Sequence, residues 1–174
     1  NILYCDATKK IPEKSSTVDL VYSSHMIEHL DSKELQSFFE ECKRVLKPNG
    51  KLIGYVAFME CFHEISYSHL SFKALENYSE QNNMKLLKIG AGSRFGIDYH
   101  LSILLYPIPF KIGRKITSGL IRMIFKIKSY FAFLGLILVR NMNFRDAKIL
   151  SLDYYRLEVL RQSVGFNFII EKNK

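Results

Sequence analysis

The chain has 174 residues, of which 48% are hydrophobic and 24% charged, and its formal net charge at pH 7 is +8. This length and composition are ordinary for one globular domain with a sizeable core. The three cysteines, Cys5, Cys42 and Cys61, lie far apart without C-x-x-C spacing. They therefore argue against a disulfide framework or a zinc site, and they favour a reducing, cytoplasmic compartment.

The charge is divided unevenly along the chain. Residues 1–90 contain 11 Lys and Arg against 12 Asp and Glu, whereas residues 91–174 contain 14 against 5. The first half is therefore almost neutral and the second half is a basic module.

The near-neutral half alternates between predicted strands and helices. Asn1–Tyr4 is typical of the end of a strand, and the apolar run Val18–Tyr22 predicts a strand buried on both faces, as in a parallel sheet. A helix follows, with Asp31 as N-cap candidate, and it ends before Pro48. Its apolar positions recur at helical spacing: Leu35, Phe38, Phe39, Cys42, Val45 and Leu46.

Further along, Lys51–Phe58 predicts a strand, Ser71–Asn82 a helix capped by Ser71, and Met84–Gly90 another strand. This alternation is typical of α/β architecture with crossover helices. After Gly92 the remaining predicted elements are two helices and a strand: Gly113–Val139, Arg145–Ser163 and Gly165–Lys172.

Two segments of the first half carry a recognisable pattern. Asp19–Leu30 reads D-L-V-Y-S-S-H-M-I-E-H-L, and Arg44–Gly50 reads R-V-L-K-P-N-G. Together they resemble the core of the S-adenosylmethionine-dependent methyltransferases with a Rossmann-like fold, in the methyltransferase type 11 subgroup. That subgroup carries D-x-V-x-S-x-x-x-x-E-H-L and then R-V-L-K-P-G-G. The resemblance covers roughly residues 1–90 and the final strand, and it implies S-adenosylmethionine as cofactor.

The resemblance also implies a partial sheet. The family's glycine-rich loop and its first two strands precede the part that matches here; nothing in the chain reads G-x-G-x-G, and Gly90-Ala91-Gly92 comes too late. We therefore expect a methyltransferase fragment truncated at its N-terminus and inactive by itself. Residues 1–92 would form the core, residues 93–163 a basic helical insertion or lid, and residues 164–174 the last strand, antiparallel to Met84–Gly90.

Candidate cofactor-binding residues follow the predicted strands, because ligands of open α/β sheets bind beyond the carboxyl ends of the strands. Asp6 follows the first strand, and its carboxylate can accept a hydrogen bond from an adenine amino group. The resemblance assigns Asp6 and Ala7 to adenine, and Ser23, Ser24 and His25 to the methionine and ribose parts of the cofactor. The alternative is that Asp6 caps a turn and the serines only end a strand.

Two histidines are candidates for a catalytic base. His69 matches a histidine that the subgroup often has before its next helix, and His29 could border the substrate. An imidazole that titrates near neutral pH can take a proton from a hydroxyl or amine acceptor. The alternative for Glu28-His29 is a helix N-terminus whose dipole favours an acid.

A polar loop holds three residues of metal-ligand type: Glu60, His63 and Glu64. They lack the H-E-x-x-H spacing that places two histidines on one helix face. We therefore expect a solvated loop and no metal.

The helix predicted for residues 113–139 lies in a basic segment, Arg94–Arg145, with nine Lys and Arg and one acid. Basic amphipathic helices are typical of membrane-surface or anionic-partner elements. We expect either a lid alone or a lid that also contacts a membrane surface or a lipid-linked substrate. A membrane span is not expected, since the longest apolar run, Tyr130–Val139, has ten residues against about 20 required. Nucleic-acid binding is not expected, because the aromatic and basic residues are not interleaved.

The predicted function is methyl transfer from S-adenosylmethionine to a small or lipid-linked acceptor. The predicted location is the cytoplasm, with peripheral membrane contact as an option. The alternative is a non-catalytic membrane-surface or interaction module that retains a decayed methyltransferase half. A nicotinamide-dependent oxidoreductase fits less well, because the dinucleotide fingerprint is missing. The acceptor and the oligomeric state stay open.

Overall fold

The computed structural model describes residues 4–58, 65–91, 111–161 and 163–174, apart from the side chains of residues 111–115 and 118. The chain divides into two compact units, one of Asn1–Gly92 with Gly165–Lys174 and the other of Ser93–Val164. Most of the predicted strand at Asn1–Tyr4 lies outside the described residues, and Tyr4 itself belongs to no strand.

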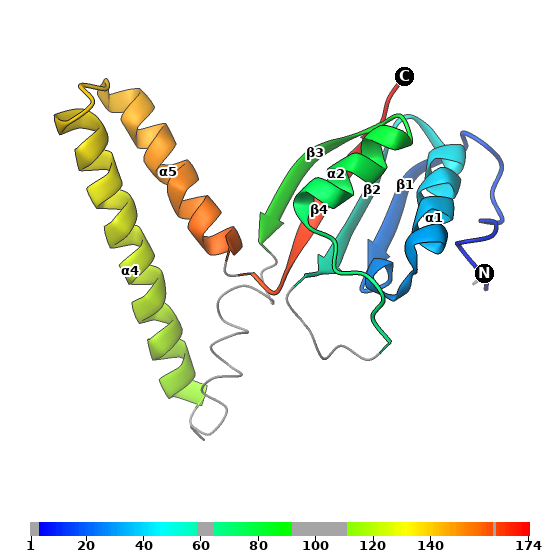
Figure 1. The fold of residues 1–174 in the computed structure, drawn as a ribbon, viewed down its shortest axis with the longest axis horizontal. Coiled ribbons are helices and arrows are strands. Elements are labelled where there is room, and N and C mark those ends of the chain that lie inside the picture. Colours follow the sequence, from blue (N-terminus) through cyan, green and yellow to red (C-terminus); the bar gives the residue numbers. More distant parts are fainter. Residues whose placement is uncertain (1–3, 59–64, 92–110, 162) are drawn as a thin grey trace. The chain divides into compact units, whose positions relative to one another are not determined.

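The first unit is built on a four-stranded sheet in the order β1-β2-β4-β3 (Figure 1). Strand β1 (Val18–Ser24) is parallel to β2 (Leu46–Ala57), while β4 (Gly165–Lys172) is antiparallel to both β2 and β3 (Met84–Ala91). The predicted α/β class and the predicted antiparallel pair of last strands are confirmed. A chain segment from each end of the sequence therefore contributes to one sheet.

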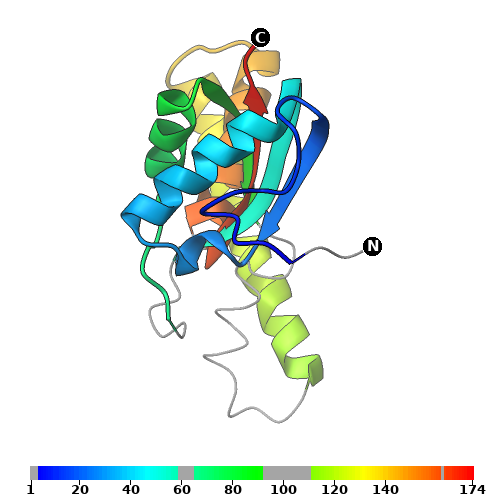
Figure 2. The ribbon, with the colours of Figure 1, turned by 90° about the vertical axis from the view of Figure 1, so that its right-hand side faces the viewer.

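Helices α1 (Ser32–Val45) and α2 (Phe72–Gln81) cover the same face of this sheet (Figures 1 and 2). Both begin at the predicted caps, since the Asp31 carboxylate accepts from the backbone of Lys33 and Glu34, and Ser71 accepts from Ala74. The core lies between sheet and helices, and its largest fully buried side chains include Leu35, Phe39, Leu52, Leu75, Phe168 and Ile170.

The prediction that β1 is buried on both faces is wrong. Leu20 is 52% exposed and Tyr22 is 71% exposed. In the described sheet β1 is the edge strand, and α1 and α2 cover only one face, so alternate side chains of β1 face solvent. The apolar run alone could not distinguish a central strand from this arrangement.

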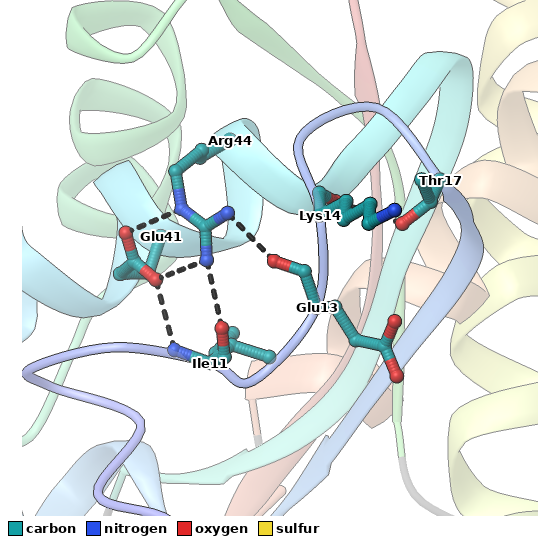
Figure 3. Close-up of polar contacts among 6 residues, drawn as sticks. All are labelled: Ile11, Glu13, Lys14, Thr17, Glu41 and Arg44. Atoms are coloured by element: carbon teal, nitrogen blue, oxygen red, sulfur yellow. Dashed lines mark hydrogen bonds and ion pairs between the residues drawn. The ribbon is translucent and has the colours of Figure 1, made fainter.

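The connection that enters β1 is held by the last turn of α1 (Figure 3). Arg44 donates from Nη1 to the backbone oxygen of Glu13 and from Nη2 to that of Ile11, both at 2.8 Å. Glu41 fixes the guanidinium with hydrogen bonds of 2.7 Å and accepts from the backbone nitrogen of Ile11 at 2.9 Å. The polar segment before β1 is therefore anchored to α1 in spite of its loop-like sequence.

The second unit contains an antiparallel hairpin of α4 (Lys111–Leu138) and α5 (Phe144–Arg161) (Figure 1). Asn143 caps α5, since its Oδ1 accepts from the backbone of Asp146 and its Nδ2 donates to the carboxylate of Asp146. The Ser129 hydroxyl donates to the backbone oxygen of Ser151 at 2.6 Å, which ties the two helices together. Among the described helices, none combines the length and hydropathy that a membrane span requires.

Candidate functional site

The carboxyl end of β1 closely approaches β2. A Cβ added at Gly54 would collide with the backbone oxygen of Ser23 and lie 2.7 Å from the Phe168 ring, so only glycine permits this spacing. Ser23 is 5% exposed, and its buried hydroxyl has no hydrogen-bond partner among the described residues. Ser24, the next residue, is exposed. The strand thus ends in one buried and one accessible hydroxyl.

His25 turns the chain away from the sheet. Its φ of 52° lies in the left-handed region, which a residue other than glycine occupies at a cost of about 1 kcal/mol or more. Its backbone nitrogen donates to the Tyr55 oxygen at 3.3 Å, and its ring centroid lies 4.6 Å from that of Tyr55. Such a conformation at the end of a strand is common at functional sites.

Glu28 is fully buried beside this turn, and its Oε1 lies 3.3 Å from Nδ1 of His25. The hypothesis that Glu28-His29 opens the long helix is wrong. Ile27–His29 forms a separate 3-10 turn, and α1 begins only at Ser32 behind its own cap. The acid therefore faces the interior and His25, not the dipole of α1.

The 3-10 turn is the anchor for a segment that precedes α2. The backbone oxygen of Glu28 accepts from the nitrogens of Tyr67 at 2.9 Å and Ser68 at 3.1 Å. Nδ1 of His29 lies 2.9 Å from the backbone oxygen of Ile65, and a carbonyl can only accept, so this nitrogen carries the proton. The His29 ring thus holds the segment that begins at Ile65 by a hydrogen bond.

His69, the other predicted base, has partners at both ring nitrogens. Nδ1 lies 3.0 Å from the backbone oxygen of Phe58 and Nε2 lies 2.9 Å from the Ser66 hydroxyl. A carbonyl can only accept, so Nδ1 carries a proton; the Ser66 hydroxyl that faces Nε2 also lies 3.5 Å from the Glu28 backbone oxygen. A base role for His69 stays a prediction, and it would require Ser66 to release Nε2.

Asp6 closes a turn of its own. Its Oδ1 accepts from the backbone and hydroxyl of Thr8 at 3.0 and 2.6 Å, and its Oδ2 lies 3.1 Å from Nζ of Lys9. The Thr8 hydroxyl and the Lys9 ammonium lower the pKa of Asp6 to about 2. Ala7 lies within the same turn. The turn-capping alternative thus describes this conformation, and adenine contact by Asp6 and Ala7 stays a prediction.

The predicted site residues fall into two groups, one at the end of β1 and the other, Asp6 and Ala7, in the turn before it. Ser23, Ser24 and His25 lie together at the end of β1, and the 3-10 turn connects them to the segment that carries His69. Within the described part of the chain, Asp6 makes no polar contact with this group. Sequence reasoning missed Glu28 and Ser66 as members of the group, although the E-H-L pattern contained a signal for Glu28.

No group of three potential metal ligands occurs among the described residues. The three polar-loop residues considered above, Glu60, His63 and Glu64, lie outside them.

Comparison with known proteins finds one family model that matches the first third of the chain. Residues 1–54, which include β1, the 3-10 turn and α1, match the family model described as a methyltransferase domain. The predicted resemblance to the S-adenosylmethionine-dependent methyltransferases with a Rossmann-like fold is therefore confirmed for this part of the chain. The predicted truncation stays a prediction. No curated protein sequence matches the chain.

Solved structures with a similar fold cover most of the chain. An S-adenosylmethionine-dependent methyltransferase from Methanosarcina mazei has a TM-score of 0.48 at 11% identity, over 96% of this chain and 64% of its own. Phosphoethanolamine N-methyltransferase 2 from Haemonchus contortus, solved with S-adenosylmethionine or S-adenosylhomocysteine, has 0.45 at 14%, over 98% and 36%. The cyclase SpnF has 0.49 at 14%, over 97% and 54%. The chain spans less than two thirds of the length of each.

The end of β1 offers polar groups to the cofactor that the methyltransferase resemblance implies. The unpartnered Ser23 hydroxyl is a buried polar atom that a ligand group would satisfy, and such atoms in folded proteins call for a partner. The exposed Ser24 lies at the same strand end. The glycine-rich loop is not in this sequence, so the fit covers only the contacts made from β1.

Proposed function

We propose that this chain is part of an S-adenosylmethionine-dependent methyltransferase that acts on a small or lipid-linked acceptor. The observation that carries the proposal is the buried, unpartnered Ser23 hydroxyl beside the His25–Glu28 pair, within the segment that matches the methyltransferase domain. When bound, the cofactor supplies an electrophilic methyl group.

The residues of the chain have distinct parts in this proposal. Ser23, Ser24 and the backbone at His25 bind the cofactor, and Gly54 allows the strand end to take its position. Glu28 orients the imidazole of His25 through the 3.3 Å contact, while the 3-10 turn holds the segment of His69 next to it. Much of the rate of methyl transfer can come from such positioning, so a strong acid or base is not required.

The acceptor class is the finer part of the proposal. The second unit is basic, and its hairpin carries exposed apolar side chains, which suits an acceptor that is amphiphilic or anionic. The other acceptor that we propose is a small molecule, with the same hairpin acting as a lid over it.

The test is calorimetric binding of S-adenosylhomocysteine to the natural full-length protein and two variants. Ser23→Ala removes a buried hydroxyl without a partner, so the free energy of unfolding stays equal or rises. Cofactor affinity should nevertheless fall about fivefold to tenfold, the value of one hydrogen bond. Asp6→Ala should also bind more weakly if Asp6 contacts adenine.

Lys33→Ala is the matched control, because Lys33 is exposed on the first turn of α1. A folded full-length protein that shows no heat with S-adenosylhomocysteine would overturn the proposal. If Ser23→Ala binds as well as the unchanged protein, the assignment of β1 is wrong even where the cofactor binds.

One observation favours a second candidate function, a non-catalytic membrane-surface or interaction module. The hairpin exposes several large apolar side chains, including Ile116, Leu120, Phe131 and Leu138, and such a surface is typical of an interaction site. A full-length protein that binds a partner or surface through the hairpin, and no cofactor, would establish this alternative.

A further inference from the structure

Helix α4 carries an apolar stripe that is open to solvent. Its members recur at three or four residues along the helix, and each is between 45% and 66% exposed: Ile116, Leu120, Met123, Ile124, Ile127 and Phe131. Isolated apolar residues on a surface are ordinary, but a continuous stripe of this length indicates an interaction site.

Helix α5 does not cover this stripe, because it packs against another face of α4. The contact face of α4 includes the buried Ser129, which donates to the Ser151 backbone, and Phe133, whose ring meets that of Phe144 edge-on at 5.3 Å. Helix α5 is itself apolar on several sides, with Ile149 and Leu157 about half exposed. Both helices thus keep large apolar side chains outside their mutual contact.

The charges beside this surface are positive. The sequence of α4 contains no acid, while Lys126 is exposed and has no ion-pair partner among the described residues. The three acids of α5 are occupied locally: Asp146 by Asn143, Asp153 by Arg156, and Glu158 by Arg161 and Lys128. Arg161 and Lys128 lower the pKa of Glu158, so it stays ionised within this network and offers little attraction to an outside cation.

A groove of about 410 Å³ runs between the two helices, and its walls include Tyr130, Phe133, Phe144 and Leu152. Lys126 and Lys148 line the same groove from opposite helices. Among the described residues, no acidic side chain lines it. The hairpin therefore combines apolar rings with two ammonium groups, which suits phosphate groups above an acyl layer.

We propose that the α4–α5 hairpin binds the surface of a membrane that contains anionic lipids. The apolar stripe of α4 enters the boundary between headgroups and acyl chains, while Lys126 and Lys148 contact lipid phosphates. The hairpin lies on the membrane and does not cross it, in agreement with the lack of a span-length apolar helix among the described residues. The inference does not depend on the methyltransferase proposal, because it uses only residues of the second unit.

The test is sedimentation of the full-length protein with two kinds of vesicle, phosphatidylcholine alone and an equal mixture with phosphatidylglycerol. We expect binding to the mixed vesicles that weakens as salt rises from 50 to 500 mM, and little binding to neutral vesicles. The variant Lys126→Glu/Lys148→Glu should bind at least about tenfold more weakly, since each basic residue near an anionic surface contributes. The control Lys33→Glu/Lys88→Glu has the same change in net charge on the first unit and should bind nearly as well as the unchanged protein.

A fluorescent reporter locates the contact independently: residues 1–174 contain no tryptophan, so the emission of each single-Trp variant is compared with that of the unchanged full-length protein. Phe131→Trp, at a residue 66% exposed on the stripe, should show a blue-shifted emission with phosphatidylglycerol vesicles. Tyr22→Trp, at a residue 71% exposed on β1, should not. The pair Leu120→Gln/Ile127→Gln keeps good helix formers and should reduce binding while circular dichroism stays the same.

Three results would overturn the proposal. One is equal binding to neutral and anionic vesicles. Another is a loss in Lys126→Glu/Lys148→Glu no larger than in its charge-matched control. The third is an unchanged Phe131→Trp emission, which would mean that a second copy of the chain or its own first unit covers the stripe; gel filtration would identify a dimer.

Discussion

The carboxylate of Glu28 is buried from solvent, with Oε1 3.3 Å from Nδ1 of a His25 whose φ is 52°. Removal of this side chain in Glu28→Ala would leave a cavity and deprive His25 of the group that faces it. We expect a loss of about 2–4 kcal/mol in the free energy of unfolding, measured by urea denaturation. Glu28→Gln retains the shape and should lose less. A Glu28→Ala variant within about 0.5 kcal/mol of the unchanged protein would show that the pair has no structural role.

The Glu41–Arg44 pair predicts a pH dependence. Hydrogen bonds from Arg44 hold the pKa of Glu41 below its ordinary value of 4.5 although burial opposes this. A depressed carboxyl pKa stabilises the fold at every pH above the ordinary value, and this contribution disappears as pH falls through the lowered pKa. The side-chain carboxyl carbon of Glu41, followed by NMR as the pH changes, should therefore titrate with a midpoint below pH 4.5. In Arg44→Gln this midpoint should rise. Equal midpoints in the two proteins would show that Arg44 does not lower the pKa of Glu41.

The same arginine connects to the segment before β1, so Arg44→Gln should have a second effect. The backbone oxygens of Ile11 and Glu13 lose their donors, and amide exchange at residues 11–17 should accelerate relative to α2. Lys43→Gln, at the neighbouring position of α1, is the matched control. Equal exchange in both variants would mean that the guanidinium does not anchor this segment.

Sequence patterns predicted the element boundaries well where the signal is local. Asp31 and Ser71 cap their helices as expected. Strand β2 nevertheless begins at Leu46, earlier than expected, with a register shift opposite β1 between Val18 and Leu20. Such irregular pairing depends on the neighbouring strand and has no mark in the sequence.

The site was harder to predict because its contacts are long-range. Glu28 lies beside His25, and a segment nearly 40 residues away donates hydrogen bonds to its backbone oxygen. The local sequence around Glu28 contains no sign of these contacts and therefore predicted only the start of a helix. Likewise the amphipathic pattern of α4 located an apolar stripe, but the helix pairs through Ser129, a polar residue. Periodicity shows that a face is apolar; it does not show what covers it.

Cys42 should resist alkylation in the folded protein. Burial raises the pKa of its thiol to about 12, so almost no thiolate exists at pH 8, and its side chain is closed to reagent. Iodoacetamide followed by mass spectrometry should modify the exposed Cys5 and leave Cys42 unmodified until urea is added. Modification of Cys42 at the rate of Cys5 without denaturant would show that α1 is not packed as described.

Replacement of Gly54 by alanine should destabilise the fold, whereas replacement of Gly90 should not. An alanine Cβ at Gly54 would collide with the backbone oxygen of Ser23 and lie 2.7 Å from the Phe168 ring, so either the β1–β2 spacing or the core must change. We expect Gly54→Ala to cost about 1–3 kcal/mol or more of unfolding free energy. It should also weaken S-adenosylhomocysteine binding by the full-length protein, because the end of β1 is displaced. Gly90→Ala places its methyl where no atom lies within 4 Å and is the matched strand control. Equal stabilities for the two variants in urea denaturation would contradict the close approach of β1 and β2, and with it the position assigned to the Ser23 hydroxyl.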